Sequence, residues 1–68
     1  MTNNIRVERA IKRMTQQQLA ELVQVSRQTI NAIEAGKYVP SSVLAMKIAA
    51  TFGKQVEEVF QLEDKDWS

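Results

Sequence analysis

Two helix-start signals lie close together in this chain, at Thr15 and Ser26, and they restrict the fold more than any other feature of the sequence. The Thr15 hydroxyl can accept a hydrogen bond from the backbone N–H of Gln18 while the Gln18 side chain reaches back, an arrangement known as a capping box. Ser26 is a favoured N-cap for a second helix over residues 27–35. Because this second helix begins so soon, the first must end around Val23. The sequence therefore predicts two short helices joined by a tight turn.

The apolar residues on both sides of this turn have the spacing of two helices packed against each other. They fall on one face of each helix within the span from about 16 to 35, and the small Ala20 allows the helices to approach closely. The turn Gln24-Val25 directs Val25 back into the core, and Gly36 suits the left-handed position after the second helix. This spacing predicts a helix-turn-helix unit. Its inner face is expected to consist of Leu19, Ala20, Val23, Ile30 and Ile33.

Three further helices are predicted around this unit, which gives an all-α fold of five helices. The segment from Gln61 to Trp67 alternates weakly between apolar and polar residues and favours a strand paired with the first few residues, so a short terminal β-ribbon is expected beside the helices. The further helices are predicted from about Asn4 to Arg13, from Ser41 or Ser42 to just before Gly53, and from Val56 to Phe60. Their inward side chains are expected to be Ile5, Val7, Ala10, Ile11 and Met14 in an incomplete first stripe, and Leu44, Ala45, Ile48 and Ala49 in the next.

A chain of 68 residues has room for one domain, here residues 1–68, and its small core is only marginally stable without some addition. The chain has no cysteine and no histidine, so neither disulfides nor a metal site is expected. Good helix packing or association with a second chain must then supply the stability. The apolar runs are short and the N-terminus lacks the pattern of a signal peptide, so a cytoplasmic location without membrane contact is expected.

The net charge of +1 hides an uneven distribution of charged residues. Residues 1–56 carry eight Lys or Arg against three Glu, a balance of +5, whereas residues 57–68 carry one Lys against five acids, a balance of −4. The chain is thus a basic body with an acidic tail. A positive body is compatible with a nucleic-acid backbone, although ordinary solvated helix faces would give the same charge.

The face of the 27–35 helix opposite the core carries side chains suited to reading DNA bases. Arginine can bridge O6 and N7 of guanine, glutamine or asparagine can bridge N6 and N7 of adenine, and a threonine methyl can contact the methyl of thymine. A merely solvated helix would favour Glu and Lys, whereas this face has four uncharged polar residues and one Arg. The predicted base contacts are Arg27, Gln28, Thr29 and Asn31.

Residues beside this face are suited to DNA phosphates. Gln16 and Gln17 lie in the first turn of the preceding helix, where free backbone N–H groups and the helix dipole favour an anion. Lys37 and Tyr38 follow the second helix and can contact the next phosphate. These two residues also have alternative roles without DNA. The Gln16 amide could simply be solvated, and the Tyr38 ring could pack on the proline that follows. The predicted phosphate contacts are Gln16, Gln17, Ser26, Lys37 and Tyr38.

These motifs resemble the Cro/C1-type (Xre-like) helix-turn-helix family of phage repressors and bacterial regulators. The resemblance covers about residues 5–60. It depends on three motifs that rarely occur together by chance: Ser26-Arg27-Gln28-Thr29-Ile30, Ile33-Glu34-Ala35-Gly36-Lys37, and Pro40-Ser41 followed by a helix rich in Leu and Ala.

The resemblance implies a compact five-helix bundle that binds operators of two-fold symmetry as a homodimer, as a transcriptional regulator and most often a repressor. It implies that Gln16 contacts phosphate and buttresses the recognition helix, that Lys37 takes a backbone phosphate, and that Arg9 and Glu34 form a structural salt bridge. It further implies that bases are faced by Arg27, Gln28 and Asn31.

Two positions depart from the family pattern. Gln24 occupies a turn position where the family often has glycine, and a left-handed conformation there would cost about 1 kcal/mol. Gln55 precedes the last helix where the family often has serine or threonine, and the loss of a good N-cap also costs about 1 kcal/mol. Both departures affect stability and leave the reading face unchanged.

Other functional classes have less support in the sequence. No catalytic constellation, phosphate-binding loop, cofactor motif or small-molecule pocket is expected, so the chain is not predicted to be an enzyme. The alternative function is an antitoxin or other protein-interaction module with the same fold and a protein partner. Trp67 either folds back onto the bundle or lies in a dimer interface, and residues 59–68 are the candidate dimerisation segment.

Overall fold

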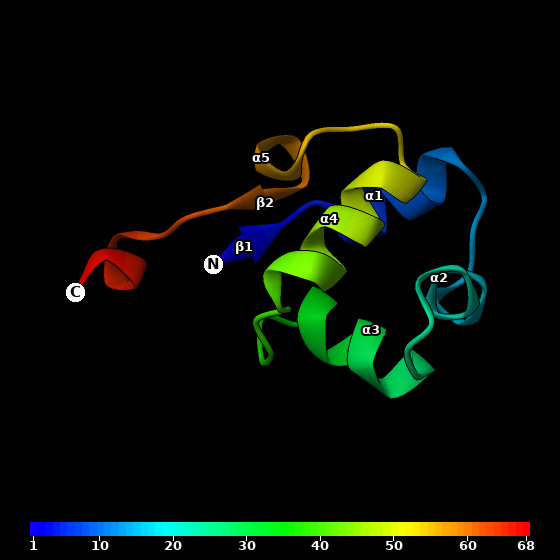
Figure 1. Ribbon diagram of the computed structural model, residues 1–68, viewed down its shortest axis with the longest axis horizontal. Helices are drawn as coiled ribbons and strands as arrows, with labels where there is room; N and C mark the ends of the chain where they lie inside the picture. Colours follow the sequence, from blue (N-terminus) through cyan, green and yellow to red (C-terminus); the bar gives the residue numbers. More distant parts are fainter.

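The computed structural model describes residues 1–68 and confirms an all-α bundle with a short β-ribbon (Figure 1). No helix is long and apolar enough to cross a membrane. The elements in chain order are β1 (Thr2–Asn3), α1 (Ile5–Ile11), α2 (Gln16–Val23), α3 (Arg27–Glu34), α4 (Ser42–Thr51), α5 (Val56–Val59), β2 (Phe60–Gln61) and the 3-10 turn η1 (Asp64–Trp67).

The helices α2, α3 and α4 begin where the capping residues predict. Thr15 and Gln18 form both hydrogen bonds of the capping box: the Gln18 N–H donates to Thr15 Oγ1 at 3.0 Å, and the Thr15 N–H donates to Gln18 Oε1 at 2.8 Å. Ser26 Oγ accepts the N–H of Thr29 at 3.1 Å. Ser41 is the N-cap of α4, so of the two serines it is the first that begins the helix. Each cap satisfies a backbone donor that the first helical turn would otherwise leave free.

The core lies between α4 and the other helices, with α4 packed against α2 and α5. The predicted inner faces of α2, α3 and α4 are all buried there. The α1 helix contributes Ile5, and the last helix and strand contribute Val59 and Phe60. Val25 is half-buried and packs on the edge of this core, as the turn requires. The burial of these apolar side chains is the main force that holds the short helices together.

The predicted inner stripe of α1 is wrong apart from Ile5 and the partly buried Met14. Val7 and Ile11 are 57% and 68% exposed, and Ala10 is also exposed. The inward position after Ile5 is Glu8, whose carboxylate lies 3.8 Å from the ammonium of Lys54. Side chains three and four residues apart share a helix face, so burial of Ile5 brings Glu8 and Arg9 inward with it. The helix is also shorter than predicted, Ile5–Ile11 rather than Asn4–Arg13.

Four helices end in the same way, with a left-handed residue and backbone hydrogen bonds that reach back over the last turn. Gly36 and Gly53 have φ values of 75° and 66°, as expected for glycine after α3 and α4. Gln24 has φ 64°, which confirms the left-handed conformation expected at this turn. Arg13 has φ 53° after α1, a strained position for which the sequence carries no signal. Both non-glycine positions store backbone strain.

The C-terminal segment differs from the predicted strand over 61–67. The strand is Phe60–Gln61, paired antiparallel with Thr2–Asn3 so that Asn3 faces Phe60, and α5 therefore ends at Val59. Residues 64–67 form η1 instead. Trp67 is 77% exposed, so the alternative in which it folds back onto the bundle is wrong. In Figure 1 this tail extends away from the helices to the left of the view.

The tail is held by the amino group of Met1, which lies 2.7 Å from Glu63 Oε1 and 2.9 Å from Asp66 Oδ2. Hydrogen bonds to Glu63 and Asp66 raise the pKa of the Met1 amino group. The same bond from Met1 lowers the pKa of Glu63, and the pKa of Asp66 is lowered first by the backbone N–H of Glu63 and then by Met1. We call these three groups the terminal clasp.

The start of α5 lacks the serine or threonine cap, as its sequence indicated. The Gln55 side chain makes no capping hydrogen bond, but the Glu58 carboxylate accepts the Gln55 N–H at 2.9 Å. One half of a capping box is therefore present. This contact recovers part of the stability that an ordinary N-cap would supply.

Candidate nucleic-acid interface

Helix α3 lies along one edge of the molecule, next to α2 (Figure 1). Burial of Ile30 and Ile33 turns its opposite face to solvent. Three of the predicted base contacts are exposed on this face, and Thr29 is half-buried with its hydroxyl 3.0 Å from Ser26 Oγ. The structure thus presents one cluster of exposed polar side chains on α3: Arg27, Gln28 and Asn31.

The predicted phosphate contacts lie at the start of α2, at the N-cap of α3 and directly after α3. The first residues of α2, Gln16 and Gln17, have backbone N–H groups that the helix itself leaves without partners. The Gln17 side chain donates to Glu21 Oε2 at 3.1 Å. Lys37 and Tyr38 are exposed just after α3, and Lys37 forms no ion pair. Ser26 acts as the N-cap of α3, so its hydroxyl already has two partners at the helix start.

The salt bridge between Arg9 and Glu34 is confirmed. Arg9 Nε donates to Glu34 Oε2 at 2.7 Å and Arg9 Nη2 donates to Glu34 Oε1 at 3.0 Å, a bidentate pair. Arg9 Nη1 also donates to the carbonyl of Met14 at 2.9 Å. The pair fixes α1 and the following loop to the C-terminal end of α3. The orientation of the exposed α3 face therefore depends on this contact.

Gln16 also contacts α3, in agreement with the buttressing of the recognition helix that the resemblance implies. Gln16 Nε2 donates to Asn31 Oδ1 at 3.3 Å and to Glu34 Oε1 at 3.2 Å. These residues are far apart in the sequence. Only the packing of α2 across α3 brings them together.

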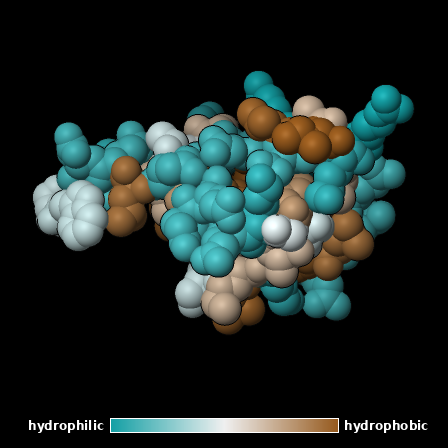
Figure 2. All heavy atoms as spheres, turned by 90° about the horizontal axis from the view of Figure 1, so that it is seen from above, coloured by the Kyte–Doolittle hydropathy of each residue, from teal (hydrophilic) through white to brown (hydrophobic).

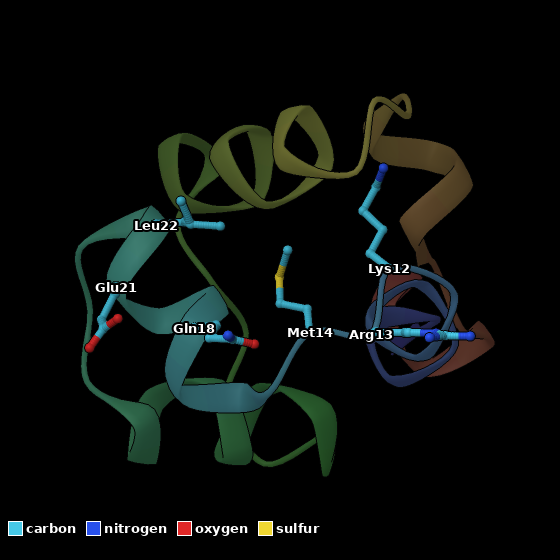
Figure 3. A pocket seen from close by; sticks show the side chains of 6 residues that line it. All are labelled: Lys12, Arg13, Met14, Gln18, Glu21 and Leu22. Atoms are coloured by element: carbon cyan, nitrogen blue, oxygen red, sulfur yellow. The ribbon is translucent and has the colours of Figure 1, made fainter.

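An open hollow of about 460 Å³ lies between the loop after α1 and α2. Figure 3 shows the Met14 side chain within it, with Lys12 and Arg13 on one side and Gln18 and Leu22 on the other. Its lining is mainly polar and charged, and no cluster of carboxylates suited to a metal ion occurs in the chain.

A capped helix pair, an exposed polar face on the second helix and free amide groups at the first define a DNA-binding helix-turn-helix. A helix-turn-helix family model matches residues 5–59, and the chain belongs to this family, of the Cro/C1 type. The protein is a helix-turn-helix transcriptional regulator that binds DNA.

Relatives of nearly equal length support this assignment. An uncharacterized HTH-type transcriptional regulator of Methanocaldococcus jannaschii is 50% identical over 97% of this chain and all of its own. The regulator YgzD of Bacillus subtilis is 46% identical over the same shares. Among solved structures, the clp gene regulator ClgR from Corynebacterium glutamicum matches with a TM-score of 0.74 and 31% identity over 79% of this chain. The match spans 57% of the ClgR chain.

Proposed function

We propose that residues 1–68 form one domain that reads a specific DNA sequence by insertion of α3 into the major groove. The observation that supports this proposal is the exposed side of α3. Its polar side chains face solvent, whereas Ile30 and Ile33 on the opposite side are buried in the core. A helix fits the major groove, and its exposed side chains then meet the base edges. The proposed base contacts are Arg27, Gln28, Asn31 and, through its methyl group, Thr29.

Phosphate contacts on both sides of the groove would fix the register of α3. The backbone N–H groups of Gln16 and Gln17 supply one anion site at the start of α2, where the helix dipole adds positive potential. Lys37 and Tyr38 supply another after α3, and Ser26 lies between the two. Contacts of this kind contribute most of the affinity but no sequence information.

We further propose that the chain acts as a homodimer whose segment 59–68 contacts the second copy. Leu62 and Trp67 are 61% and 77% exposed on a tail that extends from the body, which is costly for large apolar side chains. The tail is acidic and the body basic, so the tail of one copy is complementary to the body of another. A two-fold dimer would place the two α3 helices about 34 Å apart, in successive major grooves.

We propose a repressor role for this dimer. A dimer on an operator that overlaps a promoter blocks access to it without contacting any further protein. The expected result is that purified protein lowers transcription from a template carrying its operator and leaves a template without the operator unchanged. Stimulated transcription from the operator template would contradict this role.

The first test is selection from a random duplex library at about 150 mM salt, where purely electrostatic binding has largely weakened. Enrichment of an inverted repeat is the result expected for a dimeric, sequence-reading regulator. Enrichment of a single half-site would agree with base readout by α3 but contradict the proposed dimer. No enrichment, with only weak salt-sensitive binding, would contradict sequence-specific readout and favour the protein-interaction module.

A further inference from the structure

The open hollow between the loop after α1 and α2 combines positive charge with apolar surface. Lys12 and Arg13 line it on the side of α1, Leu22 lies on the side of α2, and Met14 lies between them (Figure 3). Neither cation forms an ion pair, and Leu22 is 61% exposed. The one acid of the lining, Glu21, accepts a hydrogen bond from a neighbouring side chain at 3.1 Å. This surface suits a ligand that is both acidic and apolar.

The loop that borders the hollow is fixed by hydrogen bonds. The Met14 N–H donates to the carbonyl of Arg9 at 2.9 Å, and the Met14 carbonyl accepts from Arg9 Nη1 at 2.9 Å. Arg9 is itself held by its salt bridge to Glu34. Arg13 has φ 53°, a strained conformation that persists only where the surrounding contacts impose it. The hollow is therefore formed before a partner binds, which lowers the entropy lost on docking.

The tail carries a matching pair of side chains on η1. Residues three apart eclipse one another in a 3-10 turn, so Asp64 and Trp67 share one face. The other two acids of the tail, Glu63 and Asp66, are held by the Met1 amino group. Asp64 is exposed and forms no ion pair, and Trp67 is 77% exposed. One face of the tail thus presents a free carboxylate next to a large aromatic ring.

A single chain cannot bring the tail into its own hollow, because the two lie at opposite ends of the molecule. In Figure 1 the loop after α1 is at the right of the view and η1 is at the left, along the longest axis. A two-fold axis that runs vertically in this view exchanges the two ends, so the tail of each copy meets the hollow of the other. The same axis leaves α3 of both copies on the lower side, where one duplex can contact both.

We propose that the hollow receives the tail of a second copy, with Asp64 beside the two cations and the Trp67 ring on the apolar part of the lining. This inference rests on the proposed homodimer and names the surface that segment 59–68 contacts. The exchange is reciprocal, so each dimer contains two such contacts. A guanidinium group and a thioether both interact favourably with an aromatic ring, which favours tryptophan over an aliphatic side chain at this site.

Sedimentation equilibrium of the full chain tests the contact between opposite charges. Asp64→Lys and the double variant Lys12→Glu with Arg13→Glu should each weaken self-association by roughly 10- to 100-fold, because each places like charges together at both contacts. Mixed in equal amounts, the two variants should associate again. One contact of the mixed dimer then has the wild-type charges, and the other has both charges reversed. Recovery in the mixture would also show that neither variant lost association through unfolding.

Lys12→Glu and Lys47→Glu form a matched pair of single variants. Both reverse an exposed lysine, but Lys47 lies on α4 outside the hollow, where its side chain donates to Gln24. Lys12→Glu should weaken association by about 3- to 10-fold, and Lys47→Glu should leave it unchanged. Trp67 is the only tryptophan and reports the apolar contact. Its emission should shift to shorter wavelength as the wild-type concentration rises, and Asp64→Lys should show no such shift.

Four outcomes would overturn the inference. Unchanged dimers in both charge variants would mean that the tail docks elsewhere, and the proposed homodimer would stand. Species larger than a dimer would mean that tails and hollows join in an open array rather than reciprocally. Weaker binding to every duplex by the double variant, with unchanged self-association, would assign its two cations to DNA phosphates. A wild type that stays monomeric at micromolar concentration would overturn the proposed homodimer as well.

Discussion

Arg27 and Lys37 both carry a positive charge beside α3, but they lie at different places relative to the groove. Arg27 is in the first turn of α3, whereas Lys37 follows the helix. Arg27→Ala should remove about 1–3 kcal/mol of discrimination between the operator and a scrambled duplex. Lys37→Ala should weaken binding to both duplexes equally and reduce the salt slope by about one. Fluorescence anisotropy titrations at several salt concentrations measure both effects, and equal losses of discrimination would contradict the assigned roles.

Gln24 adopts a left-handed conformation for which glycine is better suited. The conformation costs about 1–2 kcal/mol for a residue with a Cβ atom, while glycine loses about 0.5–1 kcal/mol more in backbone entropy on folding. The hydrogen bond from Lys47 to the Gln24 side chain is exposed, so its loss costs little. Gln24→Gly should therefore raise the free energy of unfolding by about 0.5–1 kcal/mol. Urea denaturation measures this change.

Gly53→Ala, which replaces a left-handed glycine by a residue with a Cβ atom, is the control for Gln24→Gly. Gly53 has φ 66°, and no atom lies within 4 Å of the position that a Cβ atom would occupy, so alanine would meet backbone strain and no clash. Gly53→Ala should lower the free energy of unfolding by about 1 kcal/mol. A change of the same sign in both variants would show that backbone conformation does not decide stability at these helix ends.

At the scale of elements, the sequence predicts α2, α3 and α4 well because each has a strong capping residue at its start. It predicts α1 poorly because a helix of seven residues has too few positions to define a face, and three of its apolar residues point outward. The weak alternation after Phe60 favours a strand, but Glu63 and Asp66 bind the Met1 amino group and the chain forms η1.

The candidate site, like the fold, can be predicted from the sequence only in part. The exposed face of α3 can be predicted, since it is the face that remains once Ile30 and Ile33 are buried. The contact of Gln16 with Asn31 cannot, because it depends on the rotation of α2 relative to α3. That rotation is set by packing of the whole core, including the Arg9 and Glu34 salt bridge.

The terminal clasp should make the order of η1 depend on pH. The pKa of the Met1 amino group is raised from its ordinary value of 8.0. The charged amino group therefore stabilises the clasp fully below pH 8.0, and this stabilisation is lost as pH rises through the higher folded pKa. The pKa values of Glu63 and Asp66 are lowered from 4.5 and 3.8. The two carboxylates therefore stabilise the clasp fully above these ordinary values, and their contribution to stability is lost as pH falls through the lower folded values. The clasp is therefore complete between about pH 5 and pH 8.

Fluorescence anisotropy of Trp67, which lies in η1, measures this effect. Anisotropy should be highest between these limits and fall on both sides as η1 gains mobility. The double variant Glu63→Gln and Asp66→Asn should show a low and flat profile over the same range. A flat profile at the high value in this variant would mean that the carboxylates do not hold the tail.

At the scale of the whole molecule, the face seen in Figure 2 is mostly hydrophilic with separate hydrophobic patches, and the tail projects from the body. The chain is 34 Å along its longest axis, and its core consists of 13 apolar residues. A core of this size gives little stability on its own, so burial of the tail against a second copy would add to it. Stability should then increase with protein concentration, because dimer formation is linked to folding.

Trp67→Ala tests this link, because in the single chain the Trp67 side chain is exposed and its loss should change the free energy of unfolding by less than about 0.5 kcal/mol. In a dimer that buries it, the same change should weaken association by about 2 kcal/mol or roughly 30-fold. Sedimentation equilibrium and thermal midpoints over a range of concentrations measure both quantities. Trp67→Phe, which retains an aromatic ring, should weaken association less than Trp67→Ala. If the wild type sediments as a monomer at micromolar concentration and its midpoint does not depend on concentration, the tail is not a dimer contact and DNA binding must occur through single copies.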